Sequence, residues 1–487
     1  MKNSKPNVKA QAHRPKADPK VLGRVIKLLY ESYPALVVIT AICIVFSAVV
    51  SSIPALFLQE VIKIIGDYTV SGDWEAARAL ITPKIITLVC FYVLSILSML
   101  AYTQLMAYIT QGFLSKLRCR MFGGMQDLPI KYFDTHKHGD IMSHYTNDID
   151  ALRELVSQSL PQMISSGVIV ISVLSIMLYF SLWLTLLVLA GVILMIIISK
   201  KVGGGSAKYF IRQQATMGKA EGFIQEMMNG MKVVKVFCHE KKSAEDFDSI
   251  NNELCNDSRS AHTYASMLGP IIMNIGNILY VLTAIIGGVL ILNNVPNVSI
   301  SMKPLGISIL VPFLNMTKQF TGNVNQLSQQ VNSVVMAMAG AGRVFSLMDE
   351  KPETDDGYVT LVNAKIDSDG NITETDERTG MWAWKHPHGD GSLTYTRLRG
   401  DVRLVDVDFA YEEGKDVLHD VSVYAEPGQK VAFVGATGAG KTTITNLINR
   451  FYDIADGKIR YDGININKIK KADLRHSLGI VLQDTNL

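Results

Sequence analysis

The chain has 487 residues, enough for two or three domains of ordinary size. It is 48% hydrophobic and 19% charged, whereas soluble domains carry about 25% charged residues, so the composition favours a membrane protein. The 47 basic and 44 acidic residues leave a net charge of +3, which gives no reason to expect nucleic acid as a partner. No apolar stretch lies near the N-terminus, which is basic, so a cleaved signal peptide is not expected.

The cysteines form no C-x-x-C pair. They are Cys43, Cys90, Cys119, Cys238 and Cys255. Two lie in apolar stretches and three in polar segments, which matches neither a disulfide framework nor a zinc site. We expect free thiols.

Six apolar stretches are long enough to cross a bilayer, whose core of about 30 Å needs roughly 20 helical residues. They are Ala35–Leu58, Ile85–Tyr108, Met163–Phe180, Leu182–Ser199, Leu268–Leu292 and Leu305–Phe320. The third and fourth are continuous, and as one helix they would measure about 55 Å, so two crossings joined at the aromatic turn Tyr179–Trp183 fit better. The sixth is the weakest, because Asn315 and Lys318 lie in its second half. Buried helices of a soluble protein are a poor alternative for six such stretches.

Two of the connections between these stretches, Gln111–Gln162 and Lys200–Met267, are much longer than the others and are rich in lysine and arginine. The positive-inside rule places them, and both termini, in the cytoplasm. Apolar residues recur at helical spacing in them, as from Phe223 to Phe237, so we expect the spanning helices to continue out of the membrane. About 50 residues going out and back as helix reach roughly 35–40 Å. A peripheral helical domain without a mechanical role is the alternative.

The segment Pro19–Tyr33 precedes the first stretch and mixes apolar with basic residues. This pattern predicts an amphipathic helix at the cytoplasmic interface of the membrane. A plain solvated helix is the alternative, and the position just before a span favours the interface.

The C-terminal part contains a glycine-rich motif. Lys430–Val434 is expected to form a buried strand, Gly435–Thr443 fits G-x-x-x-x-G-K-[ST], and Ile444–Ile448 is expected to begin a helix. Glycines let backbone N–H groups close around phosphate oxygens, and the helix N-terminus adds a positive dipole end. Lys441 supplies a charge for the outer phosphates, and the Thr442 hydroxyl can ligate Mg²⁺. A glycine-rich turn without a nucleotide is the alternative, and the motif alone does not choose among phosphate-binding families.

The sequence around the motif narrows the choice among phosphate-binding families. Val402–Tyr411 alternates like an edge strand and ends in an aromatic residue. Three further segments complete the pattern: Val417–Val423, Gly457–Gly463 and Leu474–Asp484. At these residues the chain resembles the ATPase domain of the ATP-binding-cassette (ABC) superfamily.

This resemblance implies roles for individual residues. Tyr411, by itself only a strand-end aromatic, would stack on adenine, and Gly435–Thr443 would be the Walker A loop that binds ATP. The loop consists of Gly435, Ala436, Thr437, Gly438, Ala439, Gly440, Lys441, Thr442 and Thr443. Gln483 would be the glutamine that reaches Mg²⁺ or the attacking water, so that Lys441 and Gln483 serve hydrolysis while Thr442 and Gln483 hold Mg²⁺.

The membrane half is similar to type IV ABC exporters in both long inner segments. The first contains Leu128–Asp134, Gly139–Ile141 and Asn147–Asp150, and the second contains Glu226–Phe237. Six spans followed by one ATPase domain is the order of an exporter half-transporter. The fold class that this implies is an all-α transmembrane domain of six helices followed by a partial α/β P-loop ATPase domain.

Four domains are expected. Residues 1–34 form a basic cytoplasmic tail and interfacial helix, and residues 35–345 form the transmembrane domain. Residues 346–400 form a linker with an unusual insertion, and residues 401–487 form the first part of the ATPase domain. The resemblance places the N-terminus and the ATPase domain in the cytoplasm of a multi-pass protein of the cell membrane.

The chain departs from the family pattern at its end. The signature, the Walker B strand with its catalytic glutamate and the switch histidine would all follow Leu487. A phosphate-binding loop alone supplies only part of what hydrolysis needs, so we expect this chain to be a fragment that cannot turn over ATP by itself.

The second departure is the segment Val362–Leu398. Asp367–Asn371 and His388–Gly391 are turn signals between alternating stretches, which predicts one or two extra hairpins. A calcium loop at the first turn or a metal cluster around His386 and His388 is a weaker interpretation, because the first lacks the closing glutamate and turn residues explain both.

The resemblance implies ATP-driven export by a dimer of half-transporters, with ATP and Mg²⁺ as cofactors and a second, identical or different, half-transporter as partner. Polar side chains within the spans and many methionines give a weak preference for a hydrophobic or amphipathic substrate. A nucleotide-binding regulatory subunit that never hydrolyses ATP is the rival interpretation. An ATP-gated channel would need a continuous polar pore face, which the spans do not show clearly.

Overall fold

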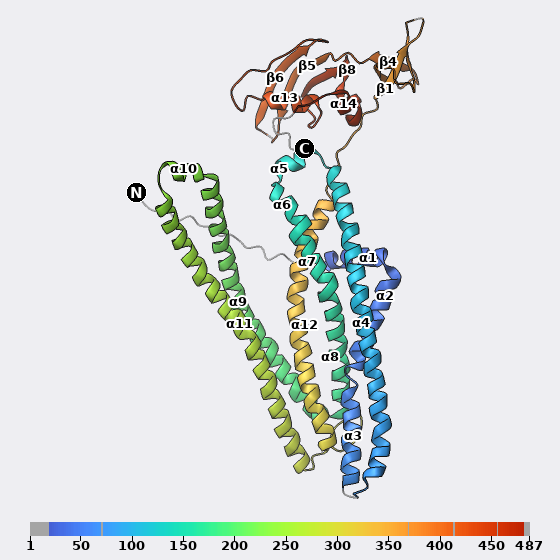
Figure 1. Ribbon diagram of the computed structural model, residues 1–487, viewed down its shortest axis with the longest axis vertical. Helices are drawn as coiled ribbons and strands as arrows, with labels where there is room; N and C mark the ends of the chain where they lie inside the picture. The colour runs from blue at the N-terminus through green and yellow to red at the C-terminus, as the bar shows by residue number, and fades with distance from the viewer. Residues whose placement is uncertain (1–18, 70–71, 369, 413, 455, 482–487) are drawn as a thin grey trace. The chain divides into compact units, whose positions relative to one another are not determined.

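The computed structural model describes residues 19–69, 72–368, 370–412, 414–454 and 456–481. The chain forms two compact units (Figure 1). One consists of Met1–Arg118 and His144–Val344, and the other of Cys119–Ser143 and Phe345–Leu487. Part of the first inner segment therefore belongs with the ATPase region.

The first unit is a bundle of long helices. They are α1 (Pro19–Ser32), α2 (Pro34–Val50), α3 (Pro54–Thr69), α4 (Trp74–Gln126), α7 (Ile149–Glu154), α8 (Leu160–Phe180), α9 (Leu182–Asn229), α10 (Met231–Val236), α11 (Glu240–Leu292) and α12 (Ile307–Met348), with two π-helical turns, His144–Asp148 and Leu155–Ser159. Among the described residues, six helical segments are long and apolar enough to cross a membrane. The six predicted spans are thus confirmed as apolar helical segments.

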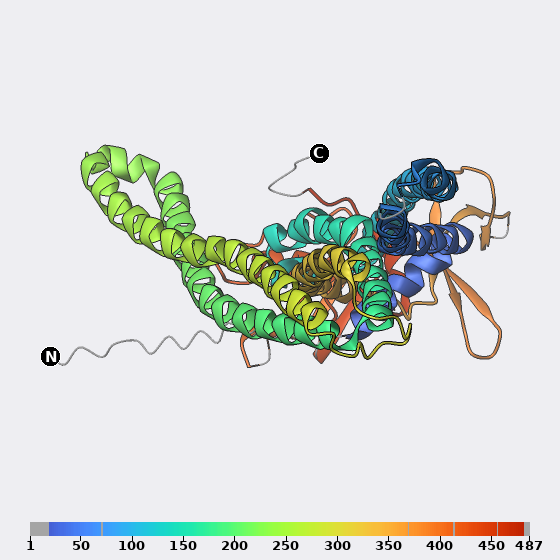
Figure 2. The ribbon, with the colours of Figure 1, turned by 90° about the horizontal axis from the view of Figure 1, so that it is seen from below.

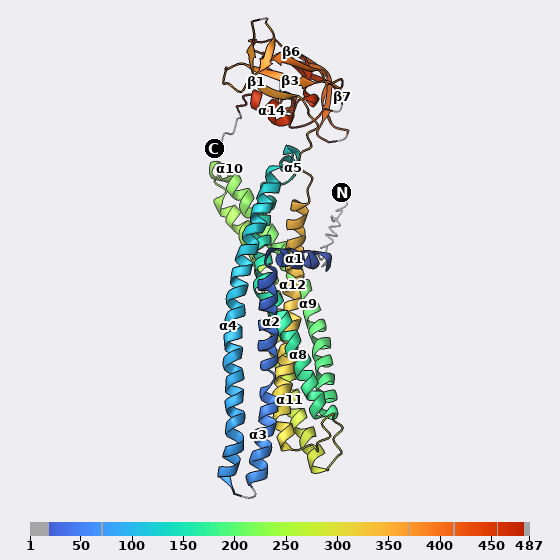
Figure 3. The same cartoon turned by 90° about the vertical axis from the view of Figure 1, so that its right-hand side faces the viewer.

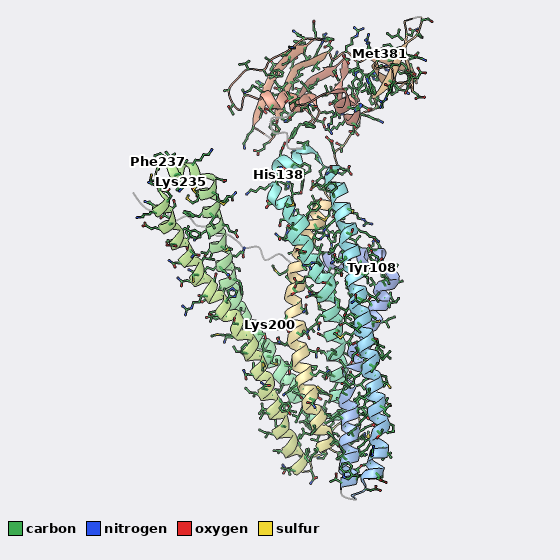
Figure 4. The ribbon with its side chains drawn as sticks, in the orientation of Figure 1. Tyr108, His138, Lys200, Lys235, Phe237 and Met381 are labelled. Carbon is green, nitrogen blue, oxygen red and sulfur yellow. The ribbon has the colours of Figure 1, made fainter. Side chains whose placement is uncertain are left out.

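The expected helical extensions are present. α4, α9 and α11 each continue without interruption far beyond their apolar stretch. α9 and α11 pack along each other, and their α10 end diverges from the other helices of the unit (Figures 1 and 2). Lys235 and the exposed Phe237 lie at this tip (Figure 4). The chain breaks between α8 and α9 at Ser181, whose backbone is extended, as the aromatic turn predicted.

The first span is not one helix. Its apolar residues predicted a continuous helix over Ala35–Leu58, but α2 ends at Val50 and α3 begins at Pro54. Proline has no N–H for the preceding turn, which explains the break. Gln319 of α12 donates a hydrogen bond of 3.1 Å from Nε2 to the carbonyl of Ser51, which satisfies one backbone group that the break leaves without a helical partner.

The core of this unit lies where α8, α9 and α12 meet. The core residues here that are fully or almost fully buried are Val173, Met177, Phe180, Leu184, Val188, Ile309, Phe313, Met316 and Phe320. Their interdigitation supplies the van der Waals packing that holds helices together where lipid tails are equally apolar.

A buried ion pair joins the π-turn before α7 to the end of α12. The Asp148 carboxylate is 2% exposed and accepts two hydrogen bonds from Arg343, one of them 3.0 Å from Nε. Nδ1 of His144 lies 2.8 Å from the same carboxylate. The hydrogen bond to Asp148 raises the pKa of Arg343 above its ordinary value. Gly340 makes room, because a Cβ there would lie 3.3 Å from Asp148 Oδ1.

We expect Arg343→Ala to destabilise the bundle, because it leaves the buried Asp148 carboxylate without its cation. The loss should be roughly 2–3 kcal/mol, less than for a fully buried pair because the Arg343 side chain is half exposed. Arg153→Ala, which removes an exposed pair with Asp150, should cost under about 0.5 kcal/mol. Equilibrium unfolding in micelles compares the two, and equal losses would contradict the assignment.

In the second unit, two short helices of the first inner segment, α5 (Ile130–Thr135) and α6 (His138–Ser143), belong with the ATPase region. The rest is two four-stranded sheets with α13 (Lys441–Ile448) and α14 (Lys471–Ser477). The first sheet contains β1 (Thr360–Ile366), β2 (Ile372–Glu374), β3 (Trp382–Pro387) and β4 (Leu393–Arg397), in the order β2-β1-β3-β4. β1–β2 and β3–β4 are hairpins whose turns are the two that the sequence indicated, so the predicted extra hairpins are confirmed.

Asp462 fastens the first sheet to the second. Its carboxylate accepts hydrogen bonds from the indole N–H of Trp384 at 3.1 Å and from the backbone N–H groups of Arg399, Gly400 and Asp401. The Trp384 ring is fully buried and meets the ring of Tyr461 edge-on, with centroids 5.6 Å apart. The insertion is therefore part of the ATPase core.

The second sheet consists of β5 (Val402–Ala410), β6 (Asp416–Ala425), β7 (Asp456–Tyr461) and β8 (Ile464–Asn465) in the order β6-β5-β7-β8. β5 pairs with β6 on one side and β7 on the other, so the prediction that Val402–Tyr411 is an edge strand was wrong. Its alternation reflects one buried face, with Leu404, Val407 and Phe409 in the core, and not a free edge.

The strand expected at Lys430–Val434 does not form, and Val434 is 93% exposed. The described strands pair antiparallel, and none lies beside this segment. An isolated apolar segment has no neighbour to receive its backbone hydrogen bonds, which is the physical reason for the difference.

Candidate functional site

The glycine loop leads directly into α13, and its conformation depends on glycine. Gly438 and Gly440 have φ values of 90° and 82°. At Gly440, which caps α13, a Cβ would lie 2.6 Å from Leu418 Cδ2 of β6. The tight packing and the left-handed backbone together require glycine here. The rest of the loop is exposed from Gly435 to Ala439, so its backbone is open to a ligand.

The Lys441 side chain curls back over the loop. Its Nζ donates to the carbonyl oxygens of Gly435 at 2.8 Å and Ala436 at 2.7 Å. These contacts hold a positive charge beside the first backbone N–H groups of α13, where the helix dipole is also positive. Loop, charge and helix end thus have the features expected of a phosphate-binding site.

The two threonines after Lys441 differ in their surroundings. Thr442 is exposed, so its hydroxyl is available to a ligand or a metal ion. Thr443 is buried, and its hydroxyl accepts a hydrogen bond of 3.2 Å from the hydroxyl of Tyr411. The structure therefore places the Tyr411 hydroxyl against Thr443 at the end of the glycine loop, and the roles of Tyr411 and Gly435–Thr443 in binding a nucleotide stay predictions. Gln483 lies outside the described residues.

Three aromatic rings form a cluster beside the loop. Tyr411 meets Phe409 and Tyr452 edge-on, with centroid distances of 4.8 Å and 4.9 Å. Tyr411 itself is 37% exposed, so part of its ring is free to stack on a planar group. The cluster fixes this ring next to the phosphate-binding loop.

Tyr452 also contacts the first inner segment. Its hydroxyl donates a hydrogen bond to the Asp134 carboxylate at the end of α5. Burial and this hydrogen bond raise the pKa of Tyr452 well above its ordinary value, so the hydroxyl remains a donor throughout the physiological range. Sequence reasoning missed this contact. Asp134 belongs to the segment Leu128–Asp134 that the sequence analysis singled out, but no local sequence pattern indicates a contact with Tyr452.

A second link joins the segment after α12 to α14. The Glu353 carboxylate accepts hydrogen bonds from Arg475 at 2.7 and 2.8 Å and from Lys471 at 3.2 Å. Burial acts to raise the pKa of Glu353, but the hydrogen bonds and charges of Arg475 and Lys471 outweigh it and lower the pKa. The Glu353 N–H also donates to the carbonyl of Asp127. This link was not predicted either.

Comparison with known proteins agrees with this arrangement. The family model described as ABC transporter transmembrane region matches residues 37–310, more than half of the chain. The family model described as ABC transporter matches residues 418–487, which include the glycine loop. The chain belongs to the ABC transporter family. Its order of six candidate spans followed by an ATPase region is that of a type IV exporter half-transporter.

Several curated ABC transporters are similar over most of the chain. An uncharacterised ABC transporter ATP-binding protein, YfiC of Bacillus subtilis, is 31% identical over 93% of the chain and 67% of its own length. A fatty acid ABC transporter ATP-binding/permease protein of Mycobacterium bovis is 29% identical over 81% of the chain and 56% of its own length. An ATP-dependent lipid A-core flippase of Syntrophus aciditrophicus is 26% identical over 79% of the chain and 57% of its own length. The chain thus spans between about half and two thirds of the relatives it matches.

If Tyr411 stacks on adenine as predicted, Tyr411→Ala should weaken binding of ATP about tenfold, because it removes the ring. Tyr411→Phe keeps the ring and loses only the hydroxyl bonded to Thr443, so its affinity should stay within about twofold. Tyr424→Ala, at the far end of β6, is the matched control. Titration with a fluorescent ATP analogue measures all three, and native affinity of Tyr411→Ala would contradict the stacking role.

Proposed function

We propose that the chain acts in ATP-driven export of a substrate across a membrane, as one half-transporter of a dimer. The observation that carries the proposal is the phosphate-binding loop before α13, with Lys441 over it and Tyr411 beside it, in the same chain as six candidate spans. A nucleotide loop without spans would indicate a soluble ATPase, and spans without the loop would indicate a passive membrane protein.

ATP would bind with its phosphates on the loop backbone and on Lys441. Its adenine would stack on Tyr411, and the exposed Thr442 hydroxyl and Gln483 would hold Mg²⁺. The ion supplies positive charge that stabilises the transferred phosphoryl group. In the exporter family the other half of each site comes from a second half-transporter, which is why we propose a dimer. Because the inner segments are basic, the ATPase region would lie in the cytoplasm.

The contact between Tyr452 and Asp134 supports a route from the nucleotide to the spans. Tyr452 packs on Tyr411, the proposed adenine platform, and donates to Asp134 in the segment that follows α4. A change in the position of Tyr411 on nucleotide binding would move the ring of Tyr452 and, through the hydrogen bond, α5. The first inner segment would thereby transmit closure of the ATPase domains to α4.

An amphipathic or hydrophobic substrate is the class we propose. The names of two relatives, a fatty acid transporter and a lipid A-core flippase, give lipid-like molecules as their substrates. The rival function, a nucleotide-binding regulatory subunit, predicts ATP binding without transport.

Transport in vesicles tests the function in the protein as its gene encodes it. Inside-out vesicles should accumulate a fluorescent lipid analogue when Mg²⁺ and ATP are added. Lys441→Ala should abolish accumulation, because the loop loses the charge that binds the outer phosphates, and Lys430→Ala, exposed in the preceding segment, should leave it unchanged. Binding of ATP without ATP-dependent movement of any amphiphile would favour the regulatory subunit.

A further inference from the structure

A cavity of about 370 Å³ lies in the membrane unit between α3, α4 and α12. This volume is within the range of roughly 300–1,000 Å³ for ligand pockets. Its lining is mostly apolar. Ala55 and Met316 are buried and form its floor, whereas Ile85, which is 49% exposed, lies at its rim. The cavity is therefore open along one side.

An ion pair marks one end of the cavity. Lys84 lines it and is paired with Glu60. The pair joins α4 to α3, two helices that lie side by side (Figure 3). The apolar stretch Ala35–Leu58 stops just before Glu60, and Ile85–Tyr108 begins just after Lys84. With the proposed orientation, the pair thus lies at the outer boundary of the hydrocarbon, and the apolar lining lies on the membrane side of it.

The membrane side of the cavity carries two amide side chains. Gln319 donates to the carbonyl of Ser51, at the break between α2 and α3. Asn315, one turn earlier on α12, is exposed and has no hydrogen-bond partner among the described residues. A polar group without a partner at this depth is costly in hydrocarbon, so the Asn315 amide points to a ligand with polar atoms next to an apolar chain.

We propose that this cavity binds a zwitterionic membrane lipid, with an acyl chain along the apolar lining and the headgroup at the ion pair. A phosphate against Lys84 and an amine against Glu60 would replace one charge pair by two and leave no charge without a partner. The ester groups next to the headgroup would meet Asn315. An anionic amphiphile would bring its charge next to Glu60, which is unfavourable. The proposal rests on the proposed function only in treating this lipid as the transported substrate.

Photolabelling of the chain tests the site without nucleotide. The chain is placed in nanodiscs of phosphatidylglycerol that contain a trace of phosphatidylethanolamine carrying a diazirine in its acyl chain, and labelled peptides are mapped by mass spectrometry. Label is expected on the segments around Leu88 and Met316. A phosphatidylglycerol probe with the same diazirine should label these segments about tenfold less.

Four variants sharpen the test. Leu88→Trp fills the cavity and should reduce labelling about tenfold, whereas Leu97→Trp, on the exposed face of the same helix, should not. Glu60→Gln should remove the preference for the zwitterionic probe, because it removes the charge that repels an anionic headgroup. The exchange Lys84→Glu with Glu60→Lys should keep the preference, because an ion pair is again present.

Equal labelling by the two probes, or native labelling of Leu88→Trp, would overturn the proposal and indicate ordinary contact with bulk lipid. Because no ATP is added, this result is independent of the transport test. A labelled cavity in a protein that moves no lipid leaves the site standing and removes the export function. Transport of lipid by a protein whose cavity is not labelled would remove the site and leave the export function standing.

Discussion

The hydrogen bond between Tyr452 and Asp134 is the contact on which the coupling account depends. A phosphate-binding loop and a set of spans can share a chain without influencing each other, and a physical connection must transmit a change from one to the other. In the proposed account Tyr452 is the start of this connection, because its ring packs on Tyr411 near the glycine loop while its hydroxyl donates a hydrogen bond to Asp134 at the end of α5. Burial and the hydrogen bond to Asp134 raise the pKa of Tyr452, which keeps this hydroxyl protonated.

The membrane unit combines uninterrupted and interrupted helices. α4, α9 and α11 are long uninterrupted helices, which in the proposed account transmit displacement. The break at Ser51–Ile53 in the first span and the buried pair of Asp148 with Arg343 are sites where the unit departs from regular apolar packing. The break also helps to form the open cavity, so the same irregularity that interrupts a helix creates space for a ligand.

Most of the sequence predictions that hold rest on local sequence patterns. The six spans follow from runs of apolar residues, the hairpins of the insertion follow from their turn residues, and the glycine loop follows from its spacing. The features that were missed or wrong depend on partners far away in the sequence. β5 is internal because β7 pairs with it, and Lys430–Val434 is not a strand because no neighbour lies beside it. Asp134 and Tyr452 are 318 residues apart, and no periodicity could have joined them. Only the break in the first span had a local signal, Pro54.

The most direct test of the coupling account measures ATP binding and ATP-dependent transport side by side in Tyr452→Phe, using the protein as its gene encodes it. Phenylalanine keeps the ring that packs on Tyr411 and removes only the hydroxyl that Asp134 accepts. The account predicts affinity for ATP within about twofold of the native value and transport reduced about tenfold or more. Native transport in this variant, or equal losses of binding and transport, would contradict it.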